Sequence, residues 1–138
     1  MTGYPWIAKP VVLAIHEAQL ATHGGQAGIR DEGLLESALA RPQNLHAYGD
    51  PDAFDLAAAY AFGITANHPF VDGNKRTAFV VSVTFLRLSG LRLTAPMDER
   101  VTKFLRLAAG EIGERELADW FRDNSANEIG RASCRERV

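Results

Sequence analysis

Hydrophobic residues recur along the chain at intervals of three and four, and no stretch keeps the two-residue alternation of a strand. This spacing predicts an all-α fold of about six short helices around one central buried helix. The expected central helix runs from about Asn74 to Ser89, because its segment Phe79–Phe85 is apolar nearly all round. The six expected inward faces are Val11, Ile15 and Ala18; Leu35, Ala38 and Leu39; Leu56, Tyr60 and Gly63; Ala78, Val81, Phe85 and Leu88; Val101, Leu105 and Ala108; and Leu117, Trp120 and Phe121.

Capping and helix-breaking residues predict where these helices begin and end. Asp31 and Asp52 are suited to cap the second and third helices. Pro42 is expected to close the second helix, so that Arg41–Pro51, which is rich in proline, glycine and small polar residues, forms a surface loop. Leu91–Thr94 is too short to build a sheet and is expected to be an extended connector.

The composition indicates an ordinary globular protein. The 138 residues suit one domain, with 46% hydrophobic and 23% charged residues. The net charge of −2 offers no basic face for nucleic acid, and no apolar run reaches the length of a membrane span. The first residues lack the pattern of a signal peptide, so we expect a cytoplasmic location. The single cysteine, Cys134, excludes an internal disulfide and a cysteine-built metal site.

The last ten residues differ from the rest of the chain. Ile129–Val138 has no apolar period and resembles the translation of a sequencing-library adapter. We therefore divide the chain into a domain over residues 1–128 and a non-native tail over residues 129–138. A natural basic tail is the alternative. Without the tail, which holds three arginines and one glutamate, the net charge changes from 15 − 17 = −2 to 12 − 16 = −4.

One nonamer concentrates the chemistry: residues 68–76 read His-Pro-Phe-Val-Asp-Gly-Asn-Lys-Arg. Pro69 ends the third helix, because a residue before proline avoids the helical conformation, and the fourth helix begins near Asn74. The start of a helix offers unpaired N–H groups and a positive dipole end, which together bind anions. His68 can accept a proton, and Asp72 can hold Mg²⁺ together with phosphate oxygens.

The phosphate-binding residues are expected to be Gly73, Asn74, Lys75 and Arg76. Glycine allows close approach of a phosphate, asparagine can cap the helix or donate to an oxygen, and the two basic residues add charge. Cations at the start of a helix oppose its dipole, which an anionic ligand would explain. Phe70 is expected to point inward and anchor the loop.

The nonamer resembles the motif of the Fic/Doc family, His-Pro-Phe-x-Asp/Glu-Gly-Asn-Gly-Arg-x-x-Arg. Seven positions match, and two depart: Lys75 replaces the second glycine and Phe79 the final arginine. Both departures are those of the Doc (death-on-curing) branch, whose motif continues Asn-Lys-Arg-Thr-Ala, as residues 74–78 do here. Residues 28–42 are also similar to this branch, and the resemblance covers roughly residues 11–121.

The resemblance implies a Fic fold and the toxin of a type II toxin–antitoxin system. It implies a kinase that uses ATP and Mg²⁺ to phosphorylate a hydroxyl of elongation factor Tu and so arrests translation. His68 is then the base, Asp72 the Mg²⁺ ligand and residues 73–76 the phosphate holders. Lys75 in place of glycine is expected to obstruct the pose used for AMP transfer, so that the γ-phosphate faces the target. The target-binding flap lies ahead of the motif in this family, which suggests Arg41–Pro51.

Regulation is expected to come from a second protein. Fic proteins are often restrained by Ser/Thr-x-x-x-Glu-Gly/Asn, but the one Glu-Gly pair here, Glu32–Gly33, has Gly28 four residues before the glutamate. A Phd-like antitoxin whose helix docks on an apolar groove is the expected partner. Two alternatives remain: a Fic-type adenylyl transferase, and a non-catalytic regulator that binds its antitoxin and DNA.

The remaining polar and aromatic candidates receive structural interpretations. His16 is expected on a helix face and His23 has no catalytic neighbours in sequence, while His46 in the loop could touch a substrate. Trp6 and Trp120 are interpreted as packing or interface anchors. The acids Asp31, Glu32 and Glu36 are interpreted as residues of a first helical turn.

Overall fold

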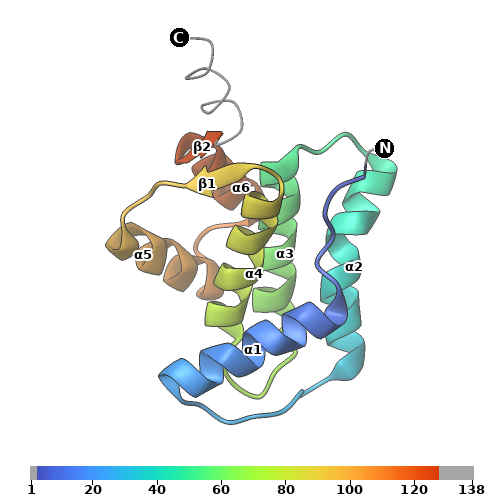
Figure 1. The fold of residues 1–138 in the computed structure, drawn as a ribbon, viewed down its shortest axis with the longest axis vertical. Helices are drawn as coiled ribbons and strands as arrows, with labels where there is room; N and C mark the ends of the chain where they lie inside the picture. The colour runs from blue at the N-terminus through green and yellow to red at the C-terminus, as the bar shows by residue number, and fades with distance from the viewer. Residues whose placement is uncertain (1–2, 128–138) are drawn as a thin grey trace.

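The computed structural model describes residues 3–127, so the tail prediction for Ile129–Val138, including Cys134, lies outside the described residues. The described chain forms six helices and two short strands (Figure 1). In order they are α1 (Lys9–His23), α2 (Glu32–Tyr48), α3 (Ala53–Asn67), α4 (Asn74–Leu88), β1 (Leu91–Leu93), α5 (Met97–Ala108), α6 (Glu114–Asp123) and β2 (Ser125–Asn127). The prediction of an all-α fold with about six helices is confirmed.

The centre of the molecule is shared by α3 and α4, whereas the sequence pattern pointed to α4 alone. Residues 56–61 of α3 form an unbroken buried run that includes four alanines and Tyr60. Their small side chains let neighbouring helices approach α3 from several sides, and α2, α4 and α6 all pack on it. On α4, Ala78, Val81 and Phe85 are buried as predicted, but Leu88 is 60% exposed near the end of the helix.

The two predicted aspartate caps are present. Asp31 accepts a hydrogen bond from the N–H of Leu34 at 2.9 Å. Asp52 forms a reciprocal capping box with Asp55 and an ion pair with Arg122 of α6. Partial burial raises the pKa of Asp52, but the hydrogen bond from the Asp55 N–H and the ion pair outweigh it, so the pKa is lowered. These caps fix the starts of α2 and α3.

The prediction that Pro42 ends the second helix is wrong, and so is the surface loop over Arg41–Pro51. Pro42 is buried inside α2, which continues to Tyr48. A proline removes one backbone hydrogen bond, the one to residue 38, and packing can compensate for this loss. Here α2 packs along α3, and Gly63 lies so close that a Cβ there would sit 3.2 Å from the freed carbonyl oxygen of Ala38.

Two helices bury a different face from the predicted one. On α1 the buried residues are Val12 and His16, while Val11 is 46% exposed. On α5 they are Phe104 and Leu107, while Val101 and Leu105 are each 51% exposed. Both helices carry two apolar stripes, and their neighbours decide which stripe turns inward. The inward face of α6, Leu117, Trp120 and Phe121, is confirmed.

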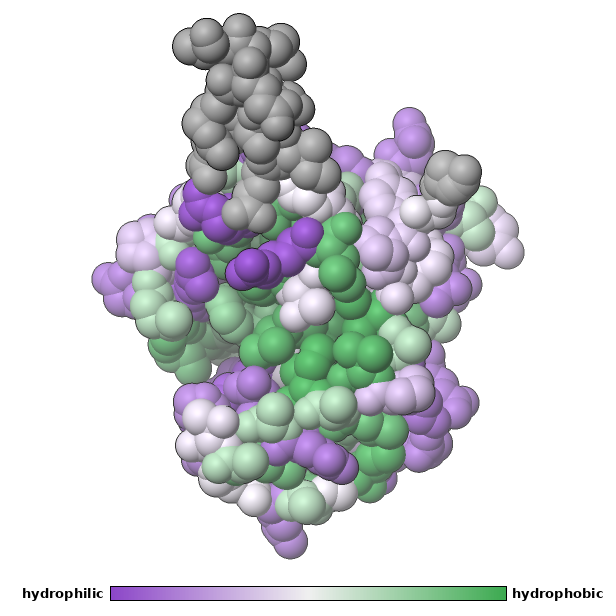
Figure 2. Space-filling view, viewed as in Figure 1, coloured by the Kyte–Doolittle hydropathy of each residue, from purple (hydrophilic) through white to green (hydrophobic). Residues whose placement is uncertain are grey.

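The expected connector after α4 is a strand. β1 pairs antiparallel with β2, with Leu91 opposite Asn127 and Leu93 opposite Ser125. This small sheet ties the end of α4 to the segment after α6. On the face seen in Figure 1, α1 crosses α3 and α4, and hydrophobic residues gather in the centre of the same face in Figure 2.

Candidate active site

Residues 68–73 of the nonamer form the loop between α3 and α4, and residues 74–76 begin α4, at one end of the central helix pair. Figure 1 shows this loop beside the connection from α1 to α2. All six predicted site residues line one cleft of about 820 Å³: His68, Asp72, Gly73, Asn74, Lys75 and Arg76. The opposite wall is α5. The structure thus brings the sequence-predicted residues together in a space that can hold a nucleotide-sized ligand.

His68 ends α3 in an unusual backbone conformation. Its φ of 52° and ψ of 54° lie in the left-handed region, which non-glycine residues rarely adopt. Its N–H donates to the carbonyl of Ile64, and its own carbonyl accepts a 2.7 Å hydrogen bond from Nε of Arg30. Arg30 also donates to the carbonyl of Asn67 at 2.9 Å. These contacts hold the backbone of His68 while its exposed side chain lines the cleft.

The segment that lies against the motif loop is Gly24–Asp31, not the expected Arg41–Pro51. The N–H of Arg30 donates to the carbonyl of Pro69 at 2.6 Å, and the N–H of Val71 donates to the carbonyl of Gly28 at 3.0 Å. The sequence did not indicate this pairing, because 40 or so residues separate the two segments.

Asn74 holds the loop from inside. Its Oδ1 accepts from the N–H of Phe70 at 3.0 Å, and its Nδ2 donates to the carbonyl of the same residue at 2.9 Å. Asn74 is 4% exposed, and Phe70 is fully buried, as predicted for the loop anchor. The polar atoms of the Asn74 side chain are therefore engaged with the protein backbone. The backbone N–H of Asn74 lies in the first turn of α4 and takes no part in these two hydrogen bonds.

Asp72 presents a fixed, ionised carboxylate. Its Oδ2 accepts from the N–H of Gln26 at 3.2 Å, and its Oδ1 accepts from the N–H of Gly73 at 2.8 Å. These two hydrogen bonds, together with the nearby charge of Arg76, lower the pKa of Asp72. The side chain is exposed toward the cleft, and each oxygen keeps a lone pair for a cation.

The start of α4 has the features of an anion site. Gly73 has a φ of 78°, so a side chain there would be strained, and no side chain caps the helix. The first turn contains Lys75 and Arg76 and no acid, whereas acidic residues cap both α2 and α3. The N–H groups of the first turn lack intrahelical acceptors. Exposed positive charge and free donors therefore meet at this point of the cleft.

His16 supports the motif loop, although from the sequence it was expected only on a helix face. Its Nε2 lies 2.7 Å from the carbonyl oxygen of Asp72, and its ring stacks on Phe70 with centroids 3.8 Å apart. It is 4% exposed. The sequence offered one signal for this role: His16 is a polar residue on the same helix face as the apolar Val12, four positions earlier. By contrast, His46 packs against Tyr4 and Trp6 and does not line this cleft.

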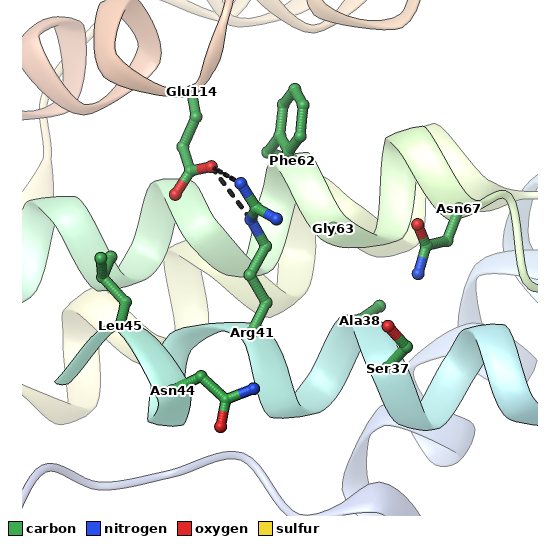
Figure 3. A pocket seen from close by; sticks show the side chains of 9 residues that line it. All are labelled: Ser37, Ala38, Arg41, Asn44, Leu45, Phe62, Gly63, Asn67 and Glu114. Carbon is green, nitrogen blue, oxygen red and sulfur yellow. Dashed lines mark hydrogen bonds and ion pairs between the residues drawn. The ribbon is translucent and has the colours of Figure 1, made fainter. Parts of the chain in front are cut away.

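A second cleft, of about 390 Å³, lies between α2 and α3 (Figure 3). Arg41 reaches across it to Glu114, with Nε and Oε1 3.0 Å apart, and lies over the ring of Phe62. Its charge is thus balanced within the protein. None of the six predicted site residues lines this cleft.

Neither a dedicated metal cluster nor a transmembrane helix is found in residues 3–127. No group of three or more histidine, cysteine or acidic side chains is placed to hold a metal there. No helix in that range is long and apolar enough to cross a bilayer.

Comparison with known proteins places the loop in a family. The family model described as Fic/DOC matches residues 6–86, which include the whole motif and α1 to α4. The chain belongs to the Fic/DOC family. It is 46% identical over 79 residues to Toxin Doc of Mycolicibacterium smegmatis (strain ATCC 700084 / mc(2)155), covering 54% of this chain and 59% of that protein.

A second relative extends the similarity beyond the match of the family model. Protein kinase doc of Escherichia phage P1 is 32% identical over 117 residues, covering 84% of this chain and 92% of that protein. Both relatives bear the name Doc, which supports the Doc branch within the Fic/DOC family. The M. smegmatis alignment spans less than two thirds of that relative.

Proposed function

We propose that this chain is the toxin of a toxin–antitoxin pair and acts as a protein kinase. It transfers the γ-phosphate of ATP to a hydroxyl of elongation factor Tu in the cytoplasm and so arrests translation. The observation that carries this proposal is the convergence of His68, Asp72 and the basic start of α4 on one cleft. The names of the relatives, a Doc toxin and a Doc protein kinase, support the same reading.

His68 is the proposed general base. It is exposed in the cleft, and the hydrogen bonds of Arg30 to the end of α3 hold its backbone. The imidazole accepts the proton of the target hydroxyl as the hydroxyl oxygen forms its bond to the γ-phosphorus. The bond from the γ-phosphorus to the bridging oxygen breaks, and ADP leaves. Proton transfer of this kind contributes about 10²–10⁴ in rate.

The start of α4 is the proposed phosphate site. The N–H groups of its first turn, with Lys75 and Arg76, stabilise the negative charge on the transferred group and orient it toward His68. For Asn74 we propose that the backbone N–H is the contact, since its side chain is engaged with Phe70. Gly73 leaves room for the phosphate, because a side chain at that position would be strained.

The residues present fit Mg²⁺ as a shared ligand of protein and nucleotide. Mg²⁺ in phosphoryl-transfer sites commonly takes one or two carboxylates and completes its shell with phosphate oxygens and water. Asp72 supplies one ionised carboxylate, already oriented by two backbone N–H groups. When bound there, Mg²⁺ would neutralise developing phosphate charge.

Lys75 favours phosphoryl transfer over the alternative, adenylyl transfer. It stands in the first turn of α4, where the adenylyl-transferring relatives have glycine, and its side chain occupies space and adds charge beside the phosphate site. The alternative predicts transfer of AMP and a different added mass on the target.

The antitoxin is proposed to bind the apolar half of the cleft with an acidic amphipathic helix. Met97, Val101 and Leu105 form a stripe on α5 that is at least half exposed, and all three line the cleft. Arg100 lies beside this stripe, donates to two backbone carbonyls and lies over the ring of Phe79, and no acidic side chain among residues 3–127 forms an ion pair with it. An apolar stripe flanked by cations suits a helix with apolar and acidic faces.

Expression in bacteria tests the proposed base. His68→Ala is expected to abolish growth arrest while the protein keeps its fold, whereas His46→Ala, at a histidine outside the cleft, is expected to remain toxic. Mass spectrometry of total protein after brief induction identifies the target and the added mass. Undiminished arrest by His68→Ala, or added AMP, would contradict the proposal.

Co-expression with the genomic neighbour tests the antitoxin site. Val101→Arg is expected to remain toxic but to escape rescue by the neighbouring protein. Val11→Arg, a matched control on α1 with similar exposure, is expected to be rescued like the wild type. Equal rescue of both variants would place the antitoxin elsewhere.

A further inference from the structure

His16 is a buried histidine that the proposed chemistry does not use. It lies on α1, 56 positions before Asp72, and is 4% exposed. Histidine in a core usually needs a hydrogen-bond partner, because burying an unpaired polar group is costly. Its partner is the backbone of the residue that we propose as the Mg²⁺ ligand.

The contact defines the protonation of one ring nitrogen. A carbonyl oxygen only accepts hydrogen bonds, so Nε2 of His16, 2.7 Å from the carbonyl of Asp72, must carry the hydrogen. The ring is fixed at the same time by its face, which stacks on Phe70 at an angle of 10°. Both the position of the donor and its direction are therefore set by packing.

Fixing this carbonyl also fixes the carboxylate. The peptide unit between Asp72 and Gly73 is planar, so holding its C=O determines the direction of the Gly73 N–H. That N–H donates to Oδ1 of Asp72 at 2.8 Å. His16 therefore helps to orient the Asp72 carboxylate, because one rigid peptide plane connects the carbonyl that it holds to the N–H that binds Oδ1.

The same ring limits the space at the start of α4. A Cβ built on Gly73 would lie 3.6 Å from Cδ2 and Nε2 of His16 and 3.3 Å from Leu20. His16 and Leu20 of α1 therefore support the back of the turn at Gly73, which has a left-handed conformation and directly precedes the first turn of α4.

We propose that His16 is a positioning residue that orients the Asp72 carboxylate and the Gly73 turn for Mg²⁺ and nucleotide phosphate. This inference rests on the proposed function, because it assigns the Mg²⁺-nucleotide site to this loop. His16 touches neither substrate nor metal in this arrangement. Its loss is expected to act mainly on Mg²⁺-ATP binding and less on the chemical step at His68. Partners that orient a metal ligand typically change metal affinity by about 10- to 100-fold.

Two substitutions separate the hydrogen bond from the packing. His16→Phe keeps an aromatic ring against Phe70 and removes the donor, whereas His16→Gln keeps a donor and removes the ring. Titration of the full chain with Mg²⁺-ATP is expected to show that His16→Phe lowers the affinity at least about 10-fold. In kinetic assays, KM is expected to rise by a larger factor than kcat falls. His16→Gln is expected to recover part of the affinity. His46→Phe, a matched control outside the cleft, is expected to bind like the wild type.

Wild-type binding of Mg²⁺-ATP to His16→Phe would overturn the inference. If the wild type itself failed to bind Mg²⁺-ATP, the proposed function would fall, and the contact would still be tested by NMR of the histidine-labelled wild-type protein. We expect the Nε2–H of His16 to exchange slowly with solvent, because it is buried and hydrogen-bonded. Rapid exchange of that proton would refute the contact even if both substituted proteins failed to fold.

Discussion

Replacing Asn74 separates a structural role from a role in binding ATP. The side chain makes two hydrogen bonds to Phe70, one to its N–H and one to its carbonyl, and both residues are buried. Each bond contributes about 0.5–1.5 kcal/mol net, and a buried group left without a partner costs about 1–3 kcal/mol. Asn74→Ala removes both bonds. We therefore expect the free energy of unfolding to fall by about 2–4 kcal/mol.

Urea denaturation followed by circular dichroism measures this change on the full chain. Asn74→Asp keeps the acceptor for the Phe70 N–H and loses the donor, so it is expected to be destabilised too. The control is Lys75→Ala, the exposed neighbour, which is expected to change stability by no more than about 0.5 kcal/mol while weakening ATP binding. An Asn74→Ala protein as stable as the wild type but unable to bind ATP would refute the reasoning and make the side chain a ligand contact.

Three further substitutions test the fold. Tyr60→Phe leaves the buried N–H of Ile7 without its 2.9 Å acceptor and is expected to cost about 1–3 kcal/mol in urea denaturation. Gly63→Ala places a methyl group against the backbone of Ala38. The cost of this crowding is expected to exceed the gain in helix propensity, so the melting temperature is expected to fall. A higher melting temperature would contradict the close packing of α2 and α3. The capping hydrogen bond and ion pair of Asp52 lower its pKa below the ordinary 3.8, so its stabilisation is complete above that pH and lost as the pH falls through the lowered value. Asp52→Asn is expected to flatten the acid limb of the stability curve, and an unchanged limb would contradict this account.

Local signals made the grouping of the candidate site residues and the starts of α2 and α3 predictable. The motif residues are neighbours in sequence, so one turn followed by one helix suffices to bring His68, Asp72 and residues 73–76 to the same cleft. Asp31 and Asp52 cap helices through contacts that reach only three residues along the chain. Such short-range geometry depends little on the rest of the fold.

Long-range packing explains what the sequence pattern did not reveal. Pro42 remains helical because α2 is held along α3, and the pattern around the proline cannot show that support. The inward stripe of α5 is chosen by its neighbours in the fold. His16 contacts the backbone carbonyl of Asp72 across 56 positions. Because every residue has a backbone carbonyl, the sequence does not indicate which one a buried histidine will bind.

Transfer of position-labelled phosphate tests the central claim most directly. The purified full chain is incubated with Mg²⁺, elongation factor Tu and ATP labelled at either the α- or the γ-phosphate. We predict label on elongation factor Tu from γ-labelled ATP alone, and none from either form with His68→Ala. Label transferred from the α-position, or undiminished transfer by His68→Ala, would contradict a kinase that uses His68 as its base.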